Sequence, residues 1–252
     1  PKNSIALKDV SYSYPNTQDF SIKGISIEIP VGSKIAFVGK TGSGKTTAAN
    51  LILSLLKPTS GKLLIDSKTL KKDQISLWQK SCSYVPQSIN LLNSSIISNV
   101  AYAIKEEEID IDRVWESIKS AQIEDLINKM PRGLSTQVGD NGIRLSGGQR
   151  QRIAIARALY RKTRFLVLDE ATSALDNKTE ANVITSLDSI MSKYKFTTIL
   201  IAHRLSTVKK CDKIYEFEAG KIKHFGSYEE LINKSSSFRE ISNLIDPGFE
   251  LI

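Results

Sequence analysis

Short, almost entirely apolar runs occur at three places along the chain, at 34–38, 165–168 and 198–201. Runs of this length without alternation are typical of parallel strands that are covered on both faces. The first run leads into glycines and then into a helical stretch over 46–56, which we expect Pro58 to end. Strands of this kind joined by helices predict an α/β fold with a mostly parallel sheet.

Strand patterns also occur near both ends of the chain. Apolar residues between Ile5 and Ile29, with a turn signal at 14–16, predict short strands that form an N-terminal antiparallel β-subdomain. Residues 213–225 predict a hairpin that turns at Ala219–Gly220. The segment 227–230 then supplies a cap and an acidic first turn for a last helix.

A helical segment interrupts this pattern between about 88 and 161. Its apolar residues recur at helical spacing, with charged residues between them. These apolar positions are Val114, Trp115, Ile118, Ala121, Leu126 and Ile127. We therefore predict one domain over 1–252. Its core and β-subdomain span 1–87 and 162–252, and a helical subdomain is inserted at about 88–161.

Composition narrows the class of protein. The chain has 252 residues, 40% hydrophobic and 25% charged, which is ordinary for a folded protein. The net charge of +8 is spread without a basic stripe interleaved with aromatic residues, so we expect no nucleic-acid partner.

Cys82 and Cys211 stand far apart in the sequence and predict neither a disulfide framework nor a zinc site. The chain opens at Pro1 without an initiator methionine, as a domain cut from a longer polypeptide would, although processing gives the same pattern.

A glycine-rich segment from Gly39 to Thr46 matches the pattern G-x-x-x-x-G-K-[ST] between an apolar strand and a helix. In such a loop, successive main-chain N–H groups point at phosphate oxygens, and the helix adds its positive end. We expect Lys45 to reach the β- and γ-phosphates and the hydroxyl of Thr46 to bind Mg²⁺. The residues expected at the nucleotide are Gly39, Thr41, Gly42, Ser43, Gly44, Lys45, Thr46 and Thr47. A glycine-rich turn without a ligand is the alternative, and the loop alone does not separate kinases, GTPases, motors and transporters.

Two carboxylates, Asp169 and Glu170, end the apolar run at 165–168. A buried parallel strand delivers its last residues to the carboxyl edge of the sheet, where ligands bind in such folds. We expect Asp169 to hold Mg²⁺ and Glu170 to polarise an attacking water. Solvated acids at a strand end are the alternative.

The segment 145–149 reads LSGGQ, and a helical run from Arg150 to Tyr160 follows it. A serine and two glycines at a helix start form a second anion-binding surface, and a helix cap is the alternative. This segment resembles the signature of ABC ATPases. In that family two domains enclose two ATP molecules, and each ATP touches the phosphate loop of one copy and the signature of the other. The resemblance implies nucleotide contacts from Ser146, Gly148 and Gln149.

Further positions are similar to the same family in the expected order. Gln87 resembles the glutamine that contacts Mg²⁺ and the lytic water, and we count it with the metal ligands Thr46 and Asp169. His203 resembles the switch histidine at the γ-phosphate, and Asp176 resembles the aspartate that contacts the second copy. With Lys45 and Glu170, the residues Gln87 and His203 complete the expected catalytic set. Tyr14 resembles the aromatic residue that stacks on adenine, with Tyr12 as the competing choice.

The resemblance covers Ile5 to about Ile245 and implies an ATPase that uses ATP and Mg²⁺. Residues 136–142 are similar to the TxVGExG segment of exporters, with Asp140 in place of glutamate. Residues 87–93, 174–177 and 207–212 are similar to exporters of lipid-linked saccharides or polysaccharides.

We therefore expect the ATPase domain of an exporter at the cytoplasmic face of the cell membrane, acting as a homodimer or pseudo-dimer. Its membrane-spanning domain would be fused N-terminally or separate, and an importer ATPase subunit is the alternative. A DNA-repair type ABC head would need a long coiled coil between Lys45 and Ser146, and this chain has only about 100 residues there and no heptads. A non-enzymatic nucleotide-binding module would be expected to lack Glu170 or His203, and both are present.

Overall fold

The computed structural model describes residues 1–17, 19–161, 163–194, 196–201 and 205–245. The chain packs into two compact units. The first unit comprises 1–82 and 195–252, and the second comprises 83–194. The predicted helical insertion at about 88–161 falls within the second unit.

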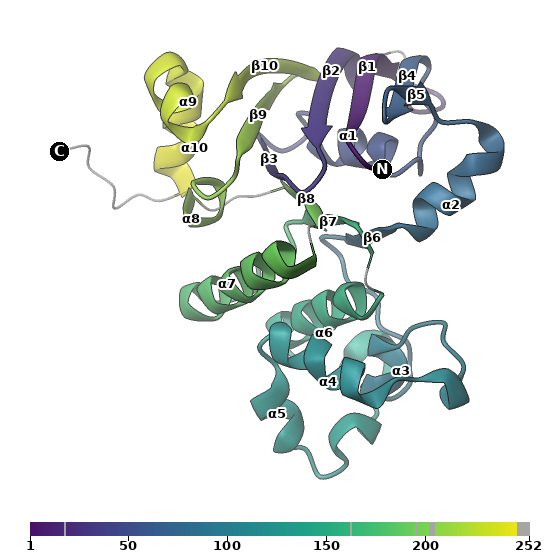
Figure 1. The fold of residues 1–252 in the computed structure, drawn as a ribbon. Helices are drawn as coiled ribbons and strands as arrows, with labels where there is room; N and C mark the ends of the chain where they lie inside the picture. Colours follow the sequence, from purple (N-terminus) through teal and green to yellow (C-terminus); the bar gives the residue numbers. More distant parts are fainter. Residues whose placement is uncertain (18, 162, 195, 202–204, 246–252) are drawn as a thin grey trace. The chain divides into compact units, whose positions relative to one another are not determined.

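An antiparallel sheet of four strands in the first unit has the order β2-β1-β4-β5 (Figure 1). Its members are β1 (Ser4–Tyr12), β2 (Ile22–Pro30), β4 (Ser60–Ile65) and β5 (Lys68–Thr69). In β2, the buried Ile25, Ile27 and Ile29 alternate with exposed residues, as expected for a sheet with one covered face. The predicted N-terminal antiparallel sheet is confirmed, and β4 and β5 extend it with strands that the sequence pattern did not indicate.

A second sheet in the first unit contains the strand before the phosphate loop. Its members within this unit are β3 (Lys34–Val38), β8 (Thr197–Ile201), β9 (Lys213–Glu218) and β10 (Lys221–Gly226). Strand β3 pairs in parallel with β8 on one side and with β9 on the other, and Ile35 lies opposite Ile199. All residues of β3 and β8 are buried. The predicted parallel pairing and the hairpin of β9 and β10 are thereby confirmed.

Helices of the first unit flank these sheets. They are α1 (Lys45–Ile52), α2 (Ile75–Lys80), α8 (Leu205–Val208), α9 (Tyr228–Lys234) and α10 (Ser236–Ile245), with a 3₁₀ turn at Lys72–Gln74. The predicted extent of the first helix, 46–56, is wrong at its end. Helix α1 stops at Ile52 because Ser54 adopts a left-handed conformation with φ of 55°.

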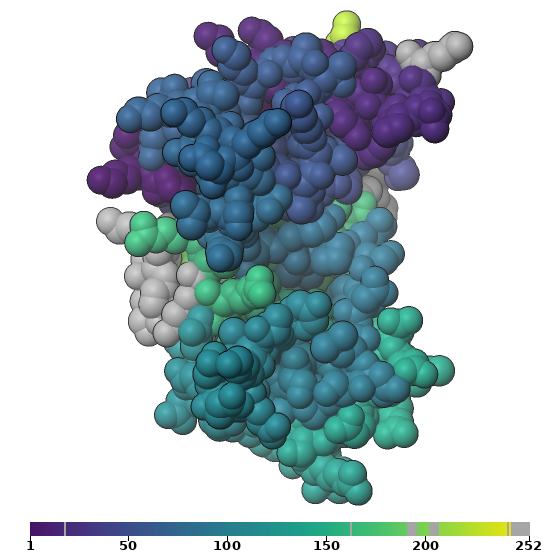
Figure 2. All heavy atoms as spheres, turned by 90° about the vertical axis from the view of Figure 1, so that its right-hand side faces the viewer, coloured from purple at the N-terminus to yellow at the C-terminus, as the bar shows by residue number. Residues whose placement is uncertain are grey.

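Helix α2 lies at the surface that faces the viewer in Figure 2, and its Leu77 is exposed. Its Trp78 is buried and donates a 2.8 Å hydrogen bond from Nε1 to the carbonyl oxygen of Ile52. Cys82 follows this helix, and burial raises the pKa of its thiol to about 12. Both cysteines are buried free thiols.

The second unit is mostly helical. Its strands β6 (Cys82–Val85) and β7 (Phe165–Asp169) are neighbours, and all of β7 is buried. The helices are α3 (Ile96–Val100), α4 (Ile111–Ser120), α5 (Glu124–Asn128), α6 (Gly147–Tyr160) and α7 (Asn177–Tyr194). Three short 3₁₀ turns lie at Glu106–Glu108, Gly133–Ser135 and Asp140–Gly142. In the part of the chain that the structure describes, no helix is both long and apolar enough to cross a membrane.

Candidate nucleotide site

The phosphate loop joins β3 to α1, as the sequence predicted. Gly39, Gly42 and Gly44 have φ of 140°, 78° and 106°, in the region that favours glycine. A Cβ atom at Gly39 would collide with the carbonyl oxygen of Phe217 in β9. The loop therefore needs glycine for its curled main chain and for its close approach to the neighbouring strand.

Lys45, the first residue of α1, is buried and turns its ammonium group into the loop. Its Nζ donates hydrogen bonds to the carbonyl oxygens of Gly39 (2.8 Å) and Lys40 (3.0 Å). The first turn of α1 holds no acidic residue, and Gly44 provides no side-chain cap. An ammonium group beside an uncapped helix start makes this loop electropositive.

Ser43 supplies the test of whether the loop fits a bound anion. Its Oγ is buried, and within the described residues it has no hydrogen-bond partner. A buried hydroxyl without a partner costs free energy that a phosphate oxygen accepting its proton would recover. Thr41 and Thr46 are exposed on the same loop. These residues fit a polyphosphate.

Tyr14 lies just beyond the end of β1, with its ring exposed. Its hydroxyl lies 3.1 Å from Oγ1 of Thr47 in α1, so this aromatic residue is joined to the helix of the phosphate loop. Tyr12 is buried and packs edge-to-face on Tyr14 at 5.0 Å between ring centroids. Only Tyr14 of the two competing residues has a largely exposed ring, which favours it as the adenine platform.

Three predicted residues lie close together in the second unit. Asp169, the last residue of β7, is buried and accepts a 3.1 Å hydrogen bond from the hydroxyl of Tyr84. Glu170 follows with a left-handed φ of 51°. The Nε2 atom of Gln87 donates a 2.6 Å hydrogen bond to Oε2 of Glu170. The predicted metal ligand and the predicted base are therefore adjacent, and the base has a fixed amide partner.

The signature segment begins helix α6. Ser146 is its N-cap, accepting a hydrogen bond from the N–H of Gln149 (3.2 Å), while Oε1 of Gln149 accepts from the N–H of Ser146 (2.9 Å). A Cβ atom on Gly148 would lie 3.0 Å from the carbonyl oxygen of Ala174. The helix cap that the sequence left as the alternative is thus present. It does not compete with anion binding, because both cap bonds use side-chain oxygens as acceptors and the hydroxyl of Ser146 and Nε2 of Gln149 keep their donor capacity.

Gln151 is a residue of this region that the sequence did not single out. It is buried in α6, and its Nε2 donates to Oγ of Ser173 (3.1 Å) and to the carbonyl oxygen of Glu170 (3.4 Å). Its Oε1 accepts from the N–H of Ala174 (3.0 Å). One side chain of the signature helix therefore spans the loop that follows Glu170. Its proximity to the LSGGQ segment was the only signal available in the sequence.

Asp176 ends the same loop and caps α7. Its Oδ1 accepts a 2.9 Å hydrogen bond from the N–H of Thr179, and bonds from the Thr179 side chain and main chain lower the pKa of Asp176. The residue is therefore a carboxylate at neutral pH.

Asp140 stands where the exporter pattern has glutamate, and it accepts a hydrogen bond from Nδ2 of Asn93 (2.5 Å). His203 lies outside the residues that the structure describes.

Known protein families and relatives were compared with the chain as a whole, including all of these motifs. A family model described as "ABC transporter" matches residues 22–173. The chain belongs to this family. ATP-dependent lipid A-core flippases are similar to it. The flippase of Cupriavidus pinatubonensis is 39% identical over 92% of this chain, and that of Pectobacterium atrosepticum is 39% identical over 96%.

A solved structure, that of a bacterial Atm1-family ABC exporter with ATP bound, matches all of this chain with a TM-score of 0.90 and 33% identity. This chain covers 39% and 41% of the two flippases and 43% of that exporter chain. The predictions of an ABC ATPase fold and of an ATP-binding ATPase domain are confirmed. The relatives named here are exporters and flippases, and no importer is among them.

Proposed function

We propose that this domain hydrolyses ATP to drive export by a larger membrane protein. The observation that carries the proposal is the phosphate loop. Its curled main chain holds a buried ammonium group and a buried hydroxyl for which the described residues provide no hydrogen-bond partner. Lys45 and Ser43 would bind the phosphates. Thr46, Gln87 and Asp169 would hold Mg²⁺. The positive charge of this ion would neutralise part of the negative charge of the phosphates.

Glu170 is the proposed base. Its carboxylate would accept a proton from the water that attacks the γ-phosphate, and Gln87 would keep this carboxylate oriented. Lys45 would stabilise the charge that develops on the phosphate oxygens. The proposed role of His203 is to hold the γ-phosphate, and Tyr14 would stack on the adenine.

A second ATPase domain completes the proposed site. Ser146, Gly148 and Gln149 would contact the ATP bound by the other copy, and the charged Asp176 would reach across the same interface. The support is the family resemblance together with an exposed helix start at the signature. The partner is a second copy or a similar domain, and hydrolysis should rise more steeply than linearly with protein concentration.

The whole protein would contain a membrane-spanning domain, either fused ahead of this chain or separate. In this proposal the ATPase domain would lie at the cytoplasmic face of the cell membrane. The names of the flippases support a lipid-linked saccharide as cargo, in agreement with the hint from segments 87–93 and 174–177.

The test is Glu170→Gln, which retains size and hydrogen bonding but removes the carboxylate. We expect ATP binding to persist, a dimer to accumulate with ATP in size-exclusion chromatography, and turnover to fall at least about a hundredfold. Lys45→Ala is the matched variant that should lose ATP binding itself. Unchanged turnover of Glu170→Gln contradicts the assignment of the base, and ATP binding by Lys45→Ala equal to that of the parent contradicts the assignment of the loop.

A further inference from the structure

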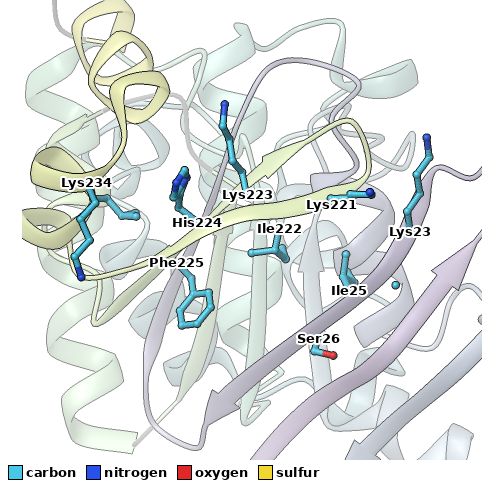
Figure 3. A pocket seen from close by; sticks show the side chains of 11 residues that line it. Lys23, Ile25, Ser26, Lys221, Ile222, Lys223, His224, Phe225 and Lys234 are labelled. Atoms are coloured by element: carbon cyan, nitrogen blue, oxygen red, sulfur yellow. The ribbon is translucent and has the colours of Figure 1, made fainter.

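Two sheet edges of the first unit face each other across a groove. Strand β2 is the last strand of the antiparallel sheet, and β10 is the last strand of the other sheet. A cavity of about 610 Å³ lies between them and is lined by consecutive residues of both strands, 23–26 and 221–225 (Figure 3). Helix α9 adds Leu231 and Lys234. The groove is therefore made mainly of strand edges.

Strand β2 is joined to the hairpin of β9 and β10 at two places. The N–H of Lys23 donates to the carbonyl oxygen of Gly220, in the turn before β10 (2.8 Å). The hydroxyl of Tyr215, in β9, accepts from the N–H of Glu28 (3.1 Å) and donates to its carbonyl oxygen (2.9 Å). Among the described hydrogen bonds, none joins the main chain of β10 to that of β2. Strand edges of this kind can accept a further strand.

The lining of the groove is basic. Among the described residues, its lining contains Lys23, Lys221, Lys223 and Lys234 and no carboxylate. Lys223 pairs with Glu218 at 2.8 Å, and Nδ1 of the adjacent His224 lies 3.4 Å from Oε2 of Glu216. For the other three lysines the described residues provide no ion pair.

Apolar side chains from both strands lie between these charges. Figure 3 shows Ile25 of β2 and Ile222 of β10 on the two facing strands, and Phe225 beside them. Phe225 is 61% exposed and Ile222 is half-buried, whereas Ile25 is buried. The apolar contacts that the groove offers therefore come from β10.

We propose that this groove binds an extended acidic segment of a partner protein as an added β-strand. The main chain of the segment would pair with the open edge of β10, its acidic side chains would meet Lys23, Lys221 and Lys234, and its apolar side chains would cover Phe225. Lysines on an edge strand discourage pairing with neutral or basic strands, so they select for an acidic one. None of the residues that line this groove is among those proposed to contact ATP, and its proposed role goes beyond ATP hydrolysis.

Peptide binding tests the proposal. The probe is a fluorescent peptide of four Glu-Val repeats, and its affinity for the 252-residue chain is measured by anisotropy. A peptide of four Glu-Pro repeats has the same charge but lacks half of the main-chain donors, so we expect it to bind about tenfold more weakly. Equal binding by the Glu-Pro peptide, or tighter binding by an eight-residue oligothymidylate, overturns the proposal in favour of a plain anion-binding surface.

Variants locate the binding. Lys23→Glu combined with Lys221→Glu should lower the affinity for the Glu-Val peptide about tenfold or more. The matched control, Lys62→Glu with Lys68→Glu, makes the same change in net charge on β4 and β5 and should leave the affinity unchanged. If the charge-reversed protein does not fold, Lys23→Gln with Lys221→Gln replaces it, with a smaller expected loss. Lys45→Ala should bind the peptide normally, and a loss of binding there would assign the peptide to the phosphate loop and refute the proposal.

Discussion

Gln87 donates a 2.6 Å hydrogen bond from its Nε2 to Oε2 of Glu170, a residue 83 positions further along the chain. Both residues belong to the second unit, and Glu170 is held in a left-handed main-chain conformation. A carboxylate in such a position has few ways to orient itself. The amide of Gln87 sets the direction in which its oxygens point.

Replacement of this amide should affect turnover more than binding. We expect Gln87→Ala to lower kcat for ATP hydrolysis about tenfold and to change KM less than about threefold, because the amide contacts the proposed base and not the phosphate loop. Steady-state kinetics measures both constants. Gln79→Ala is the control, since Gln79 in α2 donates a similar hydrogen bond to the carbonyl oxygen of Ser54 and its replacement should leave both constants unchanged. A raised KM with unchanged kcat would refute this positioning role.

Gln151 should act through the loop that it spans. In Gln151→Met the shape is nearly retained, but the hydrogen bonds to Glu170, Ser173 and Ala174 are lost. We expect kcat to fall about tenfold at unchanged ATP affinity, with a loss of about 1–3 kcal/mol in the free energy of unfolding. Gln122→Met is the matched control, because that exposed glutamine bonds to Ser186. A loss of stability with normal kcat would make Gln151 merely structural.

Tyr14 should contribute through its ring and not through its hydroxyl. Tyr14→Ala is expected to weaken ATP binding about tenfold, as the loss of a base–aromatic stack generally does, and Tyr14→Phe less than about threefold. Isothermal titration calorimetry with ATP gives both affinities. Tyr12→Phe should bind normally. Equal effects of the two Tyr14 substitutions would assign the contribution to the hydroxyl bond with Thr47 instead.

Asp66 makes the stability of the N-terminal strand pH-dependent. Its carboxylate accepts hydrogen bonds from the N–H groups of Asn3, Lys2 and Ser4, and the bond from Asn3 contributes most to lowering the pKa of Asp66 from 3.8. A lowered folded-state pKa means that this stabilisation is fully present above the ordinary pKa and is lost as the pH falls through the folded value. We expect Asp66→Asn to lower the Tm at pH 7, and the difference from the parent protein to shrink below about pH 4. A difference that is constant from pH 7 to pH 3 would contradict the role of the carboxylate charge.

Local signals made much of the fold predictable. The apolar run at 34–38 and the glycines after it require a buried strand, a tight loop and a helix, because each step depends on neighbouring residues. The strands β4 and β5 were not predictable in this way. Residues 60–69 carry few buried side chains, so their pairing with β1 depends on the edge that β1 offers and not on their own pattern.

Sequence alone determined the phosphate loop, the acidic pair at Asp169 and Glu170, the signature at Ser146 and the family. In each of these the chemistry depends on residues that are adjacent in the chain. Only the tertiary structure decided that Gln87 meets Glu170, that Gln151 spans the loop behind it, and that β2 and β10 leave a basic groove open. These relationships join residues many positions apart. They arise from how strands and helices pack, and a pattern of neighbouring residues does not record that packing.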